Sequence, residues 1–75
     1  MTPRAEIINR KVVTWVQLLA CFLKKGDVFR RPRGRTQYKF KELVPDQGIV
    51  ICLNMVTHLS EKIYYNSPVF KLVII

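Results

Sequence analysis

The alternation of residue types over positions 35–41, within a strand predicted at 35–43, is the feature that most constrains how this chain can fold. Positions of one parity are basic or polar: Arg35, Gln37, Lys39 and Lys41. Positions of the other parity are uncharged: Thr36, Tyr38 and Phe40. Successive residues of a β-strand point to opposite faces, so this pattern predicts a half-exposed antiparallel strand with one cationic face.

This predicted strand belongs to a basic segment, residues 24–41, which holds eight of the thirteen Lys and Arg residues and a single acid, Asp27. A shorter strand is expected at 28–31. Pro32 and Gly34 lie between the two and are typical of a turn. The segment from Arg30 to Lys41 is therefore predicted to form a β-hairpin with a cationic tip.

The overall composition supports a folded, basic domain. The chain has 75 residues, of which 49% are hydrophobic and 24% charged, so it is expected to form a single domain rather than a disordered tail. Its net charge of +8 favours an anionic partner: nucleic acid, a membrane surface or an acidic protein. Because the charge is clustered, nucleic acid is the favoured class.

The cysteine and histidine content argues against a metal centre. Cys21 and Cys52 both lie in apolar runs, and we interpret them as reduced core residues of a cytoplasmic protein. With only His58 to join them, a structural zinc site lacks ligands, and no cofactor is expected. No apolar stretch reaches the length of about 18 residues that a membrane-spanning helix needs, so no membrane contact is expected.

The N-terminal third allows more than one interpretation. Residues 1–5 are expected to be loose, and a first strand is expected at 6–13. Thr14 and Gln17 fit a capping box, and apolar residues follow at helical spacing, which favours a short helix from Trp15 to Leu23. A strand is the alternative, because 12–22 is a nearly continuous apolar run. The stretch Leu18–Cys21 also resembles a bacterial lipoprotein signal, which we disfavour because polar residues interrupt the run.

The remaining chain predicts further strands at 49–56, 62–65 and 69–75, separated by turns at 45–48 and 66–68. The segment 49–56 is apolar on both faces and is expected to be the central strand. The last strand would be prone to aggregation at a free edge, so it must pair inside a closed sheet or across a homodimer. We expect one mainly β domain over 1–75, with a small antiparallel barrel of about five strands over 27–75 and one short N-terminal helix.

The stretch from Leu23 to Phe29, Leu-Lys-Lys-Gly-Asp-Val-Phe, resembles the opening of many SH3-like small barrels of bacteria and phages. In these proteins a Gly-Asp turn leads into a barrel strand, and the later strands follow in meander order. The resemblance implies an SH3-like barrel from about Leu23 onward, with the preceding helix plugging one open end. It does not imply a particular function.

The predicted nucleic-acid site is the cationic hairpin, whose basic residues are expected to neutralise phosphates. The proposed set is Arg30, Arg31, Arg33, Arg35, Lys39, Lys41 and Tyr38. In it Tyr38, or an exposed Phe29, is expected to stack on an unpaired base, whereas Phe40 is expected to lie in the core. The alternative interpretation is that the lysines are merely a solvated face and that Tyr38 is a core residue.

Other residues carry weaker hypotheses. His58, Ser60 and Glu61 share one loop, but a chain of this size leaves little room for a catalytic pocket, so no enzymatic activity is expected. Trp15 is expected to anchor the core, and Asn54 to be a buried polar residue that needs a hydrogen-bond partner or marks a bulge. Of Tyr64 and Tyr65, one is expected to be exposed, as part of a ledge for a base or a peptide, and the other buried.

The sequence thus predicts a protein that binds DNA or RNA through phosphate contacts. The main alternative is an accessory module of phage or plasmid type that docks on an acidic protein. A homodimer with paired C-terminal strands is a third possibility.

Overall fold

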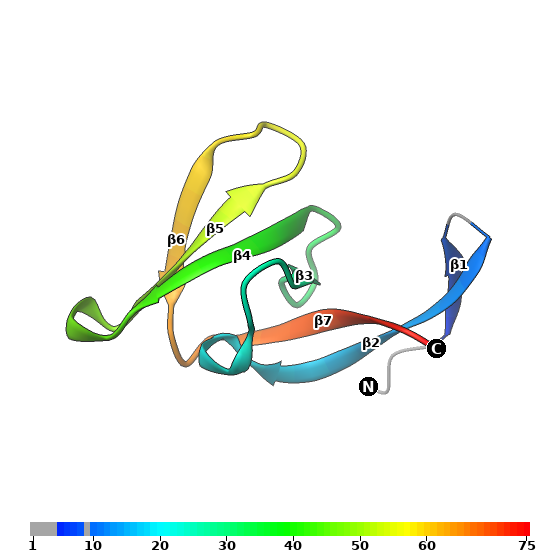
Figure 1. Cartoon of the computed structure of the whole chain (residues 1–75), viewed down its shortest axis with the longest axis horizontal. Coiled ribbons are helices and arrows are strands. Elements are labelled where there is room, and N and C mark those ends of the chain that lie inside the picture. Colours follow the sequence, from blue (N-terminus) through cyan, green and yellow to red (C-terminus); the bar gives the residue numbers. More distant parts are fainter. Residues whose placement is uncertain (1–4, 9) are drawn as a thin grey trace.

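The computed structural model describes residues 5–8 and 10–75, and these form seven β-strands in one antiparallel sheet (Figure 1). The strands are β1 (Glu6–Ile8), β2 (Lys11–Leu19), β3 (Val28–Arg30), β4 (Gln37–Val44), β5 (Ile49–Asn54), β6 (Ser60–Tyr64) and β7 (Pro68–Ile74). Their order across the sheet is β1-β2-β7-β3-β4-β5-β6. The mainly β prediction is confirmed, with seven strands rather than about five. No hydrogen-bonded pairing joins β1 to β6 within the described residues, so the sheet is open. Most of the expected loose N-terminus lies outside the described residues.

The predicted helix from Trp15 to Leu23 is wrong, because residues 11–19 form strand β2. Every residue from Val13 to Leu19 has a partner on β7, which supplies the backbone hydrogen bonds that a helix would have made internally. β-branched residues in this run also favour the extended conformation. Helical geometry is confined to a single 3-10 turn, η1 (Ala20–Phe22). The expected strand 6–13 is divided between β1 and the start of β2, which pair with each other.

The C-terminal strand lies inside the sheet, as expected. β7 pairs with β2 along its length and with β3 at Phe70 and Lys71, so its pairing is made within the chain rather than across a dimer. β5 lies between β4 and β6, next to the edge, so the prediction of a central position for it is wrong. The central position belongs to β3, which is only three residues long and joins the β2–β7 part of the sheet to the β4–β6 part (Figure 1).

One buried cluster forms the core of the curled sheet. It draws on η1 and on strands β3 to β7: Ala20, Leu23, Phe29, Phe40, Val50, Cys52, Ile63 and Val69. Ile63 of the edge strand β6 and Val69 of β7 belong to the same cluster, so the sheet curves around a single centre. Trp15 is buried as expected, but it lies outside this cluster.

Asn54 is the buried polar residue that the sequence indicated. Its side-chain Nδ2 donates to Oε2 of Glu61 at 2.6 Å, and its Oδ1 accepts from the N–H groups of Val56 at 2.9 Å and Thr57 at 3.1 Å. The predicted hydrogen-bond partners are therefore confirmed, and this one side chain fixes the turn between β5 and β6.

Both cysteines are free, Cys52 being buried and Cys21 half-buried. The stretch 18–21, which resembles a lipoprotein signal, lies at the end of β2 and in η1, where Ala20 is fully buried. Within the described ranges no helix has the length and apolarity to cross a membrane.

Titration of Cys52 is expected to destabilise the fold at high pH. Burial, and secondarily the Glu61 carboxylate, raise the pKa of the Cys52 thiol to about 11. Because the unfolded thiol ionises near its ordinary pKa of about 8.5, this contribution to stability is complete below that pH and is lost as pH rises towards 11. Urea unfolding at several pH values should therefore show a steeper decline for the wild type than for Cys52→Ala. Equal slopes would contradict the prediction.

Candidate nucleic-acid interface

The predicted cationic hairpin is present and consists of β3, β4 and the connection between them. Val28 pairs with Lys39, Phe29 with Tyr38 and Arg30 with Gln37. At the tip the N–H of Gly34 donates to the carbonyl oxygen of Arg31 at 3.0 Å, which closes a four-residue turn. Pro32 restricts the second position of this turn, and Arg33 takes the left-handed conformation at φ 64°.

The tip arginines are exposed and have no acidic partner in the described part of the chain. Arg31, Arg33 and Arg35 are all exposed, and no described carboxylate lies within 4.0 Å of their guanidinium groups. The one acid of the basic segment, Asp27, instead accepts from the backbone N–H of Lys24 at 2.8 Å and pairs with Lys71 at 3.4 Å. The positive charge of the tip is therefore not neutralised locally.

Arg30 occupies a different position from the tip arginines. Phe29 points into the core, so its neighbour Arg30 points to the opposite face of the short strand. There the Arg30 guanidinium lies over the ring of Trp15, with Cζ 4.2 Å from the ring centroid. This is a cation–π geometry, and it holds a half-buried Arg30 against the sheet.

Phe29 and Tyr38, the two aromatics considered for base stacking, both pack against the core. Phe29 is completely buried, which rules out the expectation that it is exposed. Tyr38 is half-buried, packs on the core and stacks with Phe29 at a centroid distance of 5.7 Å. Burial, and to a lesser degree the Glu61 carboxylate, raise the pKa of Tyr38, while the charge of Arg31 opposes this rise. Phe40 is buried, as expected.

The lysines of β4 line an open hollow of about 610 Å³ on the outward face. The pairing of β4 with β5 is interrupted by a bulge between Phe40 and Glu42, and Lys41 is the bulged residue. Lys41 Nζ donates to the hydroxyl oxygen of Ser60 at 3.3 Å, so it reaches across β5 to β6. The lining residues are Lys25, Gly26, Lys39, Phe40, Lys41, Glu42 and Leu53.

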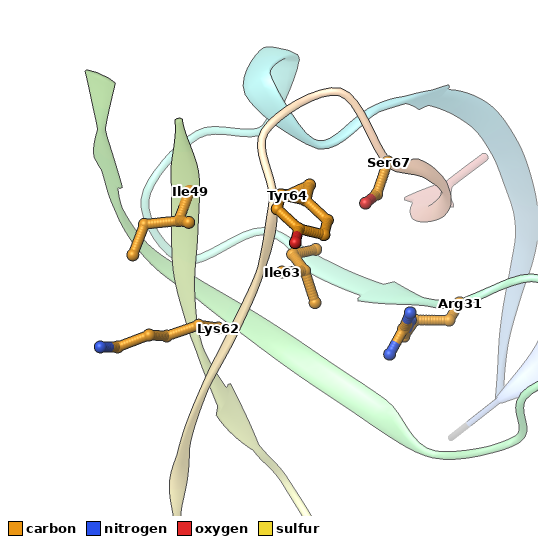
Figure 2. A pocket seen from close by; sticks show the side chains of 6 residues that line it. All are labelled: Arg31, Ile49, Lys62, Ile63, Tyr64 and Ser67. Carbon is orange, nitrogen blue, oxygen red and sulfur yellow. The ribbon is translucent and has the colours of Figure 1, made fainter. Parts of the chain in front are cut away.

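A second hollow, of about 330 Å³, lies along the edge strand β6. Its lining residues are Arg31, Ile49, Lys62, Ile63, Tyr64 and Ser67. Figure 2 shows Arg31 and Lys62 on opposite sides of β6, with the Tyr64 ring between them in this view. Arg31 thus connects the hairpin tip with an edge strand that is more than thirty positions away in sequence.

The sequence did not assign Lys25, Lys62 or Ser67 to the site. Lys62 and Tyr64 are two positions apart in a predicted strand, and this spacing indicates that both lie on one face of β6. Tyr64 is exposed, as one residue of the tyrosine pair was expected to be. The prediction that the other tyrosine is buried is wrong: Tyr65 is exposed and covers Gly48, whose φ of 64° favours glycine.

No described hydrogen bond joins the three polar residues of the His58 loop to one another. His58 is exposed, Glu61 accepts the hydrogen bond from Asn54, and the Ser60 hydroxyl accepts from Lys41. Among the described residues, no three His, Cys, Asp or Glu side chains lie together in a way that suits a metal ion.

Comparisons with known proteins give no guide to this site. No protein-family model matches the chain, and no curated protein or solved structure matches it.

Proposed function

We propose that this protein is a non-enzymatic nucleic-acid-binding module that contacts phosphates through the tip and outward face of the β3–β4 hairpin. The observation that carries the proposal is the group of exposed tip arginines without a described acidic partner, next to the lysine-lined hollow of β4. Phosphates supply negative charge to a surface on which basic side chains outnumber its one described acid, Glu42. The contacting set is Arg31, Arg33, Arg35, Lys39 and Lys41. Tyr38 supports the hairpin from the core side, and Trp15 holds Arg30 on the opposite face.

We further propose that β3 to β7 form an SH3-like small barrel. The order β7-β3-β4-β5-β6 supports this assignment, because it is a meander whose last strand lies beside its first. The core residues shared by β6 and β7 also favour a barrel-like curvature. This arrangement leaves the outward face of the hairpin available to a ligand.

Charge neutralisation at the tip tests the proposed function. Each lost phosphate contact lowers the slope of log K against log salt by about 0.7 for a single strand and about 0.9 for a duplex. Arg33→Gln/Arg35→Gln should therefore lower the slope by about 1.4 to 1.8 and weaken binding about ten-fold at low salt. Fluorescence anisotropy with a labelled single strand and a labelled duplex measures both quantities.

Arg10→Gln/Lys11→Gln is the matched control, because it removes the same charge from exposed positions at the start of β2. This pair should leave the salt slope nearly unchanged. If both double variants behave alike, the binding depends on net charge alone, and the hairpin site is wrong. If the wild-type protein binds neither probe at low salt, the proposed function is wrong.

The second candidate function is docking on an acidic protein. It is favoured by exposed apolar side chains at the turn between β5 and β6: Met55, Val56 and Leu59. Competition with polyglutamate separates the two candidates. If the surface docks acidic proteins, polyglutamate and unlabelled nucleic acid should displace the labelled nucleic acid at similar concentrations of negative charge. If it is a nucleic-acid site, unlabelled nucleic acid should displace the label at a lower concentration of charge than polyglutamate does.

A further inference from the structure

The outward face of β4, β5 and β6 has an apolar centre. Along β5, Val50, Cys52 and Asn54 are buried, while the alternate residues Ile49, Ile51 and Leu53 point outward and are half-buried. These three outward aliphatic side chains form an apolar strip along β5. A surface that contacts only water usually carries polar residues at such positions.

The register of the sheet places cationic and aromatic side chains on either side of that strip. Leu53 pairs with Lys39 on one side and Ser60 on the other, and the next outward residue of β5, Ile51, pairs with Glu42 and Lys62. The strip is therefore bordered by cations and by one carboxylate. Directly paired residues lie on the same face, so Lys39 and Lys62 are on opposite sides of the strip, about 12 Å apart from the strand spacing and the rise of two residues. Lys41, bonded to Ser60, spans the strip between them.

Tyr64 completes this face. It pairs with Ile49 at the end of the strip and is 73% exposed, although it belongs to a regular strand. It lines the hollow that also contains Lys62 and Arg31 (Figure 2). Leu53 lines the first hollow and Ile49 the second, so the apolar strip of β5 connects the two.

We propose that the ligand of this face is a single-stranded nucleic acid, which crosses from the lysines of β4 over the strip to β6 and stacks one base on Tyr64. This inference rests on the proposed function and specifies its ligand. A duplex presents phosphates to the cations but keeps its base faces stacked inside the helix, so it leaves Tyr64 and the aliphatic strip unused. A single strand satisfies all three features, because phosphates meet Lys39 and Lys62 while unpaired bases meet the apolar strip and the ring.

The test compares a labelled 12-nucleotide oligothymidine with a 12-base-pair duplex in fluorescence anisotropy, at matched salt. The wild type should bind the single strand more tightly. Tyr64→Ala should weaken single-strand binding between about 5-fold and about 150-fold, the range for removing one aromatic stacking platform. Its salt slope should stay constant, since no phosphate contact is lost. Tyr64→Phe keeps the ring and should bind like the wild type.

The remaining outcomes separate this inference from the proposed function. Lys62→Gln should lower the salt slope by about 0.7, because it removes one phosphate contact from the same face. If both probes bind equally and Tyr64→Ala changes neither affinity, the single-strand inference is wrong and the proposed function stands. If neither probe binds the wild type, the proposed function itself fails. Unchanged thermal unfolding of Tyr64→Ala, expected from the exposure of this residue, excludes a folding defect as the cause of weaker binding.

Discussion

Phe29→Ala is expected to remove a large share of the free energy of unfolding and to weaken nucleic-acid binding, although Phe29 belongs to no contacting surface. The side chain is 0% exposed and lies on the shortest interior strand, the one that joins both parts of the sheet. Replacing a buried phenylalanine by alanine costs about 3–5 kcal/mol. At about 0.05–0.15 kcal/mol per residue, a chain of this length has a total stability of only about 4–11 kcal/mol.

The same substitution also removes the ring that stacks on Tyr38. The β3–β4 hairpin then loses its inner support, and the tip arginines lose their fixed positions. Circular dichroism during urea unfolding measures the change in stability, and anisotropy with the labelled single strand measures binding. Phe22→Ala is the matched control, because Phe22 is 66% exposed and its removal should shift the unfolding midpoint only slightly. A Phe29→Ala protein as stable as Phe22→Ala would contradict the assignment of Phe29 to the core.

The hairpin was predictable because its polar and apolar residues follow only the two-residue period of a strand. Polar and aromatic residues alternate from Gln37 to Phe40, and this alternation fits a strand but not a helix. Pro32 and Gly34 then mark the turn between the strands. The pairing of Phe29 with Tyr38 follows from these local signals without reference to the rest of the fold.

The apolar run of β2 does not have a single period, so its secondary structure could not be predicted in the same way. An unbroken apolar run has apolar residues at both the helical and the strand spacing. Trp15, Leu18 and Phe22 therefore match one face of a helix, while Val13 and Trp15 match one face of a strand. The deciding partner, β7, begins about fifty residues later, and its pairing is a tertiary effect that local propensity does not contain. The buried Val13 and Trp15, two positions apart, show the strand period that prevailed.

The candidate site was predictable as a set of charges but not as a surface. The sequence gives no means of distinguishing Arg30 from Arg31, because the difference depends on Trp15 of another strand lying beneath Arg30. Likewise, Lys62 and Tyr64 joined the site only through the register of β5 with β6. What a single sequence lacks here is the identity of the neighbouring strand, and that neighbour decides which cations remain available to a ligand.

Asn54→Ala is expected to be the most damaging polar substitution, because Asn54 holds the β5–β6 turn through three hydrogen bonds. One of these joins the side chain to the Glu61 carboxylate at 2.6 Å, and the other two satisfy backbone N–H groups of the turn. Hydrogen bonds to charged groups contribute about 1.5–3 kcal/mol and neutral ones about 0.5–1.5 kcal/mol, so a loss of about 3 kcal/mol is expected. Such a loss would free the edge strand β6, and with it Lys62 and Tyr64.

Two controls show whether the hydrogen bonds of Asn54 cause this loss. Thr57→Ala alters the same turn but removes only an exposed bond, in which Thr57 Oγ1 accepts from the N–H of Leu59 at 3.3 Å, so it should cost less than about 1 kcal/mol. Glu61→Gln keeps an acceptor for Asn54 but removes its charge, and it should fall between the other two. Urea unfolding gives all three free energies. The predicted order requires Asn54→Ala to be the least stable; if Thr57→Ala loses as much, the turn itself, rather than the buried amide, determines how firmly β6 is held against β5.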